Sequence, residues 1–186
     1  MLIKENTIAD HNNSLLSNHQ RRFNFVAEGI PDCKDVVQKL MDFNVAIPSW
    51  ALGTGGTRFG RFGAGGEPAS LEQKMQDVGL LHALNKSSGA ISLHIPWDIP
   101  ENYSAIKNLA AQYGLQFDAV NSNTFQDQKN QVLSYKFGSM QHVNKAVRKQ
   151  AIEHNIEVIK HGIELGSKAL TVWLSDGSCF PGQLNF

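Results

Sequence analysis

Four short apolar runs constrain the fold of this 186-residue chain most strongly, because each ends in polar and aromatic residues. The runs are Val45–Trp50, Ile91–Trp97, Phe117–Asn123 and Ala169–Asp176. Helical patterns separate them, and nearly continuous apolar runs are typical of parallel strands covered by helices. The carboxyl ends of such strands meet on one face, where (β/α)₈ barrels place their active sites. The pattern predicts an α/β fold that is the N-terminal half of a (β/α)₈ TIM barrel, with right-handed crossover helices.

The domain organisation follows from the same pattern. Residues 1–30 are polar with few apolar anchors, which predicts an N-terminal extension that is partly helical. Residues 31–186 hold the four predicted βα units. Ser70 followed by Gln73 predicts a capping box before the second crossover helix, and Gly114 is placed to end the third.

The clearest predicted helix runs from Asn144 to Leu165 and is followed by Gly166. One side of it carries four isoleucines: Ile152, Ile156, Ile159 and Ile163. Residues 124–143 before it have little regular pattern, and a connection of that length is commonly functional or part of an interface.

Composition and charge exclude several function classes. Seventeen basic and seventeen acidic residues balance, so no electrostatic case exists for nucleic acid or an anionic membrane as the main partner. The N-terminus lacks a signal-peptide pattern, and no apolar run reaches transmembrane length. Two distant cysteines, Cys33 and Cys179, imply no disulfide framework. We expect a cytoplasmic protein with no membrane and no nucleic-acid partner.

A glycine-rich segment, Gly53–Gly66, invites comparison with phosphate-binding loops. It contains no Walker sequence, and Arg58 stands where a dinucleotide fingerprint needs its third glycine. We interpret it as a loop at the barrel mouth whose apolar side chains, Phe59 and Phe62, could cover a pocket or reach a neighbouring subunit.

The strand ends supply the candidate chemistry. His94 is the most suggestive titratable residue, suited to proton transfer or to a hydrogen bond with substrate. All three tryptophans, Trp50, Trp97 and Trp173, fall near predicted strand ends, and aromatic walls suit the apolar faces of sugar rings. Side-chain amides and carboxylates at the same face could bind hydroxyl groups, namely Asn121, Asn123 and Asp176. No zinc pattern, catalytic triad or convincing carboxylate pair is present in the sequence.

The sequence resembles the L-rhamnose isomerase family, of the broad-specificity type that also acts on rare aldoses such as D-allose. The resemblance covers residues 40 to 186 and rests on motifs that occur in the same order: Val45–Trp50, Gly53–Phe59, Ser92–Asp98, Phe117–Phe125, Ser134–Ser139, Glu153–Asn155 and Gly166–Trp173.

This resemblance implies a metal-dependent aldose–ketose isomerase on a (β/α)₈ barrel, interconverting L-rhamnose and L-rhamnulose. It implies a homotetramer that uses a divalent metal such as manganese. His94 would lie by the sugar ring oxygen and assist ring opening, while Trp50, Trp97 and Trp173 would form the pocket wall. Phe59 would reach into a neighbouring subunit's site. The family's metal ligands lie on later strands, so these residues alone imply no metal ligand, and we expect the 186-residue segment to be inactive by itself.

Two other interpretations stay open. A half-barrel exposes the edges of its first and fourth strands, so the chain could be a non-catalytic module that binds sugar or a partner chain. A different sugar-phosphate or nucleic-acid enzyme on the same barrel type is the third, because fold alone does not fix function.

Overall fold

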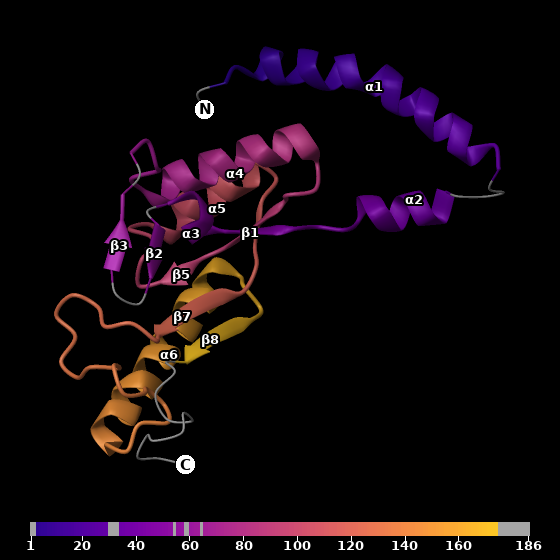
Figure 1. Ribbon diagram of the computed structural model, residues 1–186. Coiled ribbons are helices and arrows are strands. Elements are labelled where there is room, and N and C mark those ends of the chain that lie inside the picture. Colours follow the sequence, from indigo (N-terminus) through magenta and orange to yellow (C-terminus); the bar gives the residue numbers. More distant parts are fainter. Residues whose placement is uncertain (1–2, 30–33, 54, 58–59, 64, 175–186) are drawn as a thin grey trace.

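The computed structural model describes residues 3–29, 34–53, 55–57, 60–63 and 65–174. Its strands are β1 (Ala46–Pro48), β2 (Gly55–Thr57), β3 (Gly60–Phe62), β4 (Ala90–Ser92), β5 (His94–Ile95), β6 (Gln116–Phe117), β7 (Val120–Thr124) and β8 (Leu170–Leu174). Its helices are α1 (Glu5–Ala27), α2 (Lys34–Met41), α3 (Ser49–Leu52), α4 (Leu71–Asn85), α5 (Tyr103–Gln112) and α6 (Lys145–Leu165). Helices and strands alternate along most of the chain (Figure 1).

The predicted parallel arrangement is confirmed. β1, β4 and β6 form one parallel ladder, and β5, β7 and β8 form a second. Backbone bonds from Asp118 N–H to the Ile91 carbonyl (2.9 Å) and from Asn121 N–H to the Leu93 carbonyl (2.8 Å) join the two ladders. The strand order therefore follows the chain order, as in part of an α/β barrel, although the described strands do not close into one.

An extra residue interrupts the third strand. Ile91 pairs with Phe117, whereas His94 pairs with Asn121, so four steps on one strand oppose three on the other. This is a β-bulge, which bends a strand and re-aims the side chains that follow it. The bulge lies directly before Asn121, at the start of the strand ends that carry the candidate residues.

The first predicted strand is shorter than its apolar run. β1 ends at Pro48, and Trp50 lies in the one-turn helix α3 instead of on the strand. Proline has no N–H to donate to a ladder, which explains the early end. The glycine-rich segment was interpreted as a loop at the barrel mouth, and within it β2 and β3 pair antiparallel.

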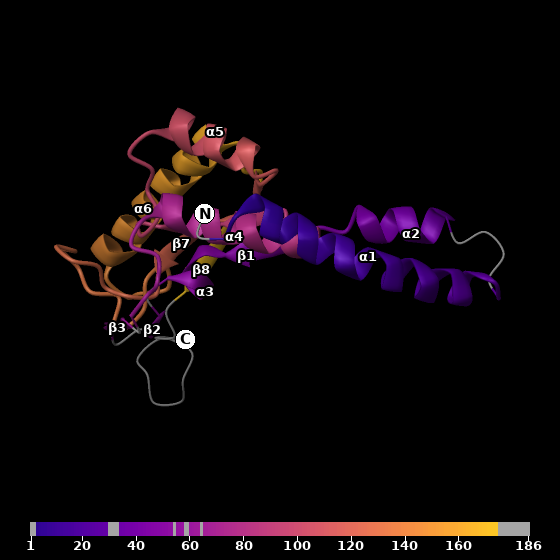
Figure 2. The same cartoon turned by 90° about the horizontal axis from the view of Figure 1, so that it is seen from above.

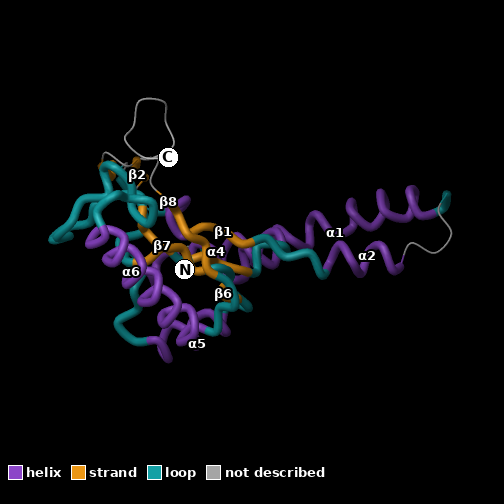
Figure 3. Tube along the Cα trace, turned by 90° about the horizontal axis from the view of Figure 1, so that it is seen from below, coloured by secondary structure: helices purple, strands orange, loops and turns teal. Residues whose placement is uncertain are grey.

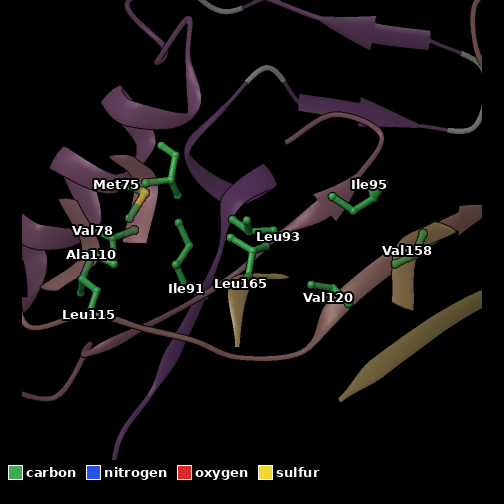
Figure 4. Packing of buried hydrophobic residues seen from close by; sticks show 11 residues of the cluster. Met75, Val78, Ile91, Leu93, Ile95, Ala110, Leu115, Val120, Val158 and Leu165 are labelled. Atoms are coloured by element: carbon green, nitrogen blue, oxygen red, sulfur yellow. The ribbon is translucent and has the colours of Figure 1, made fainter. Parts of the chain in front are cut away.

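Three helices flank the strands, and α5 and α6 lie along one side of them in Figure 3. Met75 and Val78 of α4 are fully buried, as are Ile91 and Leu93 of the adjoining strand segment. Figure 4 shows this cluster continuing through Ile95, Val120 and Val158. One apolar core therefore connects the helix layer to the strands.

The predicted helix ends are largely confirmed. Ser70 accepts a hydrogen bond from Gln73 N–H at 3.3 Å, while the Gln73 side chain accepts from Ala69 N–H at 2.7 Å. The reciprocal contact therefore lies one residue before the position that a standard capping box uses. Gly114, which follows the α5 C-cap residue Tyr113, has φ +66, and Gly166 has φ +82 directly after α6; this conformation favours glycine.

α6 packs with a different face from the one its isoleucines mark. Its buried residues are Val147, Ala151, Asn155, Val158, Gly162 and Leu165. The isoleucines share a face as predicted, but they are 44–69% exposed. α6 thus has two apolar stripes, and only one contacts the sheet.

The N-terminal region forms an arm. In Figures 1 and 2, α1 and α2 run away from the body of the molecule, and the first part of α1 lies over α4. The Asn12 amide donates to the Ala83 carbonyl at 3.0 Å, which fixes that contact. Within the segment predicted as an N-terminal extension, α1 is helical over 23 residues. Among the described helices, none combines the length and apolar character needed to cross a membrane.

Candidate functional site

Four of the predicted site residues come together at the carboxyl ends of the strands. His94 begins β5, Trp97 lies in the turn after it, Trp50 lies in α3 after β1, and Trp173 lies in β8. Phe59, the fifth predicted residue, lies outside the described residues, as does Asp176.

His94 is the centre of this group and is 2% exposed. Its ring stacks on Trp97 with a centroid distance of 4.0 Å and an interplanar angle of 26°. Trp50 meets it edge-on at 5.3 Å, and Phe125 does so at 6.0 Å. An imidazole held between aromatic rings has a fixed orientation, which both hydrogen bonding and proton transfer to a bound ligand require.

The tryptophans form one continuous aromatic wall with Phe125. Trp173 lies 6.4 Å from Trp50 and 6.0 Å from Phe125, measured between ring centroids. Sequence reasoning did not select Phe125 as a wall residue, although it follows the polar end of β7 directly. Trp173 is 43% exposed, so part of this wall is open to a ligand. We name Trp50, His94, Trp97, Phe125 and Trp173 the aromatic cluster.

Polar side chains hold the rings in place. Asn121 accepts a hydrogen bond from the Trp173 indole N–H at 3.0 Å and donates to the carbonyls of Leu93 (3.0 Å) and Ala119 (3.1 Å). The Trp97 indole N–H donates to Gln128 at 3.0 Å. Asn121 was predicted as a hydroxyl-binding group, but its amide bonds are directed to the protein.

A buried acidic residue lies beneath the aromatic cluster. Asp98 is 1% exposed, and its carboxylate accepts from the His94 backbone N–H at 2.8 Å and from the Ser49 hydroxyl. Its other oxygen lies 2.6 Å from the Lys74 ammonium. Sequence reasoning missed this cluster, yet Lys74 lies between Leu71, Met75 and Val78 on the apolar face of α4, an unusual position for a lysine.

His154 connects α6 to the end of β7. Its Nε2 accepts the backbone N–H of Asn123 at 3.2 Å, which places the proton of the neutral ring on Nδ1, 3.5 Å from a Glu157 carboxylate oxygen. Burial lowers the pKa of His154 and outweighs the opposing effect of Glu157. His154 thereby stabilises the strand end that leads into Phe125.

No metal centre is evident in the part of the chain that the structure describes. Within it, no group of three or more histidine, cysteine, aspartate or glutamate side chains could hold an ion. The described residues therefore offer no donor set for a divalent metal.

Comparison with known proteins finds relatives that carry functional names. No protein-family model matches the chain. The chain is 52% identical over 155 residues to a protein of Rhizobium meliloti named "Probable sugar isomerase R00627". It is 53% identical over 148 residues to "Probable sugar isomerase mlr5709" of Mesorhizobium japonicum. These matches cover 83% and 80% of this chain but 36% and 34% of the relatives, so the chain spans about a third of the length of the sugar isomerases that it resembles.

Proposed function

We propose that this chain forms the sugar-holding wall of an aldose–ketose isomerase of the L-rhamnose type. The observation that most supports this proposal is the aromatic cluster. In it, aromatic rings contact the buried His94 at the carboxyl ends of parallel strands. The names of its two relatives support a sugar as the ligand.

The cluster suits a monosaccharide chemically. The C–H faces of a sugar ring pack against indole rings, and Trp50 and Trp173 meet nearly at right angles, with an interplanar angle of 88°. Such a corner can contact two faces of one ligand. His94 would bond the ring oxygen and transfer the proton that ring opening requires, because an imidazole nitrogen can accept or donate a proton.

The later hydrogen transfer between C1 and C2 needs groups that the described residues do not supply. In this proposal a divalent ion such as manganese would be held by residues outside the described ones, and when bound it would supply Lewis-acid polarisation of the C1 and C2 oxygens. The complete enzyme would be a cytoplasmic homo-oligomer in which neighbouring subunits, through the loop that carries Phe59, complete each site.

The test uses the chain's own fluorescence, because all three of its tryptophans belong to the aromatic cluster. Titration with L-rhamnose is expected to change the emission saturably. L-Rhamnitol, which cannot form a ring, is the matched control and is expected to have a much smaller effect. An equal response to both compounds, or no response to either, would contradict a site for a cyclic aldose.

A catalytic assay separates binding from turnover. We expect the 186-residue chain, incubated with L-rhamnose and manganese, to bind the sugar but to form no ketose. Clear turnover would refute the view that the metal site lies outside the described residues.

The second candidate function is a non-catalytic half-barrel that binds a partner chain. The exposed isoleucines of α6 favour it, and so does β8, which pairs only with β7 among the described strands. Analytical sedimentation discriminates the two, since a strictly monomeric chain that binds sugar would leave this candidate without support.

A further inference from the structure

The turn between β5 and α5 is closed by Asp98 in two ways. Its backbone N–H donates to the His94 carbonyl at 2.9 Å, and its carboxylate accepts from the His94 N–H at 2.8 Å. The four residues from His94 to Trp97 are thus held between two hydrogen bonds to one residue. Both backbone groups of His94, whose ring stacks on Trp97, are therefore bonded to Asp98.

The same carboxylate also bonds the segment that carries Trp50. It accepts from the Ser49 hydroxyl, and Ser49 is fully buried and directly precedes Trp50. One side chain therefore fixes the two segments whose rings meet at His94.

Lys74 completes the arrangement from α4. Its ammonium lies 2.6 Å from Asp98, and the two side chains are 9% and 1% exposed. Gly53 makes room for it, because a Cβ at that position would lie 3.0 Å from the Lys74 Cε. A buried ion pair adds little net stability compared with apolar side chains of similar size. We therefore expect its main effect on the geometry of the residues that Asp98 bonds.

We propose that Asp98 is a positioning residue, held by Lys74, that sets the spacing and orientation of Trp50, His94 and Trp97 for a sugar ring. This inference rests on the proposed function for the identity of the ligand. The effect of Asp98 on ring geometry can be measured without any ligand, so the two ideas can fail separately.

Two double variants separate hydrogen bonding from charge. Lys74→Met with Asp98→Asn removes both charges but leaves an amide oxygen that can accept from His94 and Ser49. Lys74→Met with Asp98→Leu removes the charges and the acceptor. Both variants avoid an unpaired buried charge, which would strongly destabilise the fold whatever the role of Asp98. Near-ultraviolet circular dichroism and tryptophan emission report the aromatic cluster, far-ultraviolet dichroism reports the fold, and emission titration gives the L-rhamnose affinity.

The leucine variant is expected to lose most of the near-ultraviolet tryptophan signal and to bind L-rhamnose about tenfold more weakly, with its far-ultraviolet spectrum unchanged. The asparagine variant is expected to restore both properties. If both variants keep the wild-type near-ultraviolet spectrum, the positioning role is wrong even where sugar binding is normal. Equal losses in both variants would also overturn it, because the ion pair alone would then be responsible.

A milder single variant tests the same role if the double variants do not fold. Ser49→Ala removes one donor to Asp98 and leaves the ion pair intact. It is expected to weaken the near-ultraviolet dichroism that arises from the contact between Trp50 and Trp173, while the melting temperature changes little. An unchanged near-ultraviolet spectrum in this variant would contradict the proposal. If no sugar binds to the wild-type chain, the proposed function fails, and these spectra still decide the role of Asp98.

Discussion

Replacing Asn121 by alanine tests how the aromatic cluster is held. Asn121 is 4% exposed, and its amide makes three hydrogen bonds, to Trp173, Leu93 and Ala119. A typical intramolecular hydrogen bond contributes about 1 kcal/mol net. The three losses are not equal, because the three freed groups differ in the hydrogen-bond partners that remain for them.

The Leu93 carbonyl keeps the Asn121 backbone N–H as a donor at 2.8 Å, so its loss is partial. Trp173 is 43% exposed, so we expect water to replace the lost acceptor of its indole N–H. The Ala119 carbonyl loses its side-chain donor. Together with the lost packing of the amide, we expect Asn121→Ala to lower the free energy of unfolding by about 2–3 kcal/mol.

That loss corresponds to a fall in melting temperature of about 4–12 °C for a chain of this size. Thermal unfolding followed by far-ultraviolet dichroism measures it, and tryptophan emission should shift as Trp173 loses its fixed partner. Asn108→Ala on the exposed face of α5 is the matched control, and we expect it to change stability by less than about 0.5 kcal/mol. Equal melting temperatures for the two variants would refute the assigned role of Asn121.

Three further predictions concern packing and pH. Gly162→Ala should destabilise the chain by about 1–3 kcal/mol in urea melts, because the new Cβ would lie 2.9 Å from a Val120 methyl group. Met75→Ala should cost about 2–5 kcal/mol because Met75 is fully buried, whereas Ile163→Ala, at 69% exposure, should cost less than about 0.5 kcal/mol in the same assay. Burial lowers the pKa of His154 below its usual value of about 6.5, so the unfolded chain binds its proton first as pH falls. Stability should therefore decline from about pH 6.5 toward the lowered pKa, and His154→Gln should flatten that decline in melts across this range; an unchanged slope would contradict the burial of a neutral ring.

Residue type and position along the chain were enough to predict most of the aromatic cluster. The carboxyl ends of parallel strands lie on one face of the sheet, so Trp97 and Trp173 could be assigned to that face from the strand pattern alone. Trp50 reached the same face by another route, because the strand stops at Pro48 and a helical turn carries it there. Its neighbours in space were predictable although its secondary structure was not.

The polar support of the cluster was not predictable by the same reasoning. Asp98 and Lys74 are 24 residues apart in sequence, and only the packing of α4 against the strands brings their charges within 2.6 Å. The position of Lys74 on an apolar helix face signals a buried partner without identifying it. The bulge before Asn121 left no sequence signal, because a nearly continuous apolar run has no alternation from which an extra residue could be read.

α6 shows which sequence feature indicates the face of a helix that packs on the sheet. Periodicity marks two apolar stripes on this helix, and the isoleucine stripe is the more hydrophobic. The stripe that contacts the sheet instead contains Gly162, whose lack of a side chain lets the helix approach β7 so closely that an added Cβ would lie 2.9 Å from a Val120 methyl carbon. Since close approach to a sheet requires small side chains, small residues at helical spacing identify the sheet-facing stripe better than hydrophobicity does. The isoleucines are then assigned to the outer surface, where they remain available for contact with another helix.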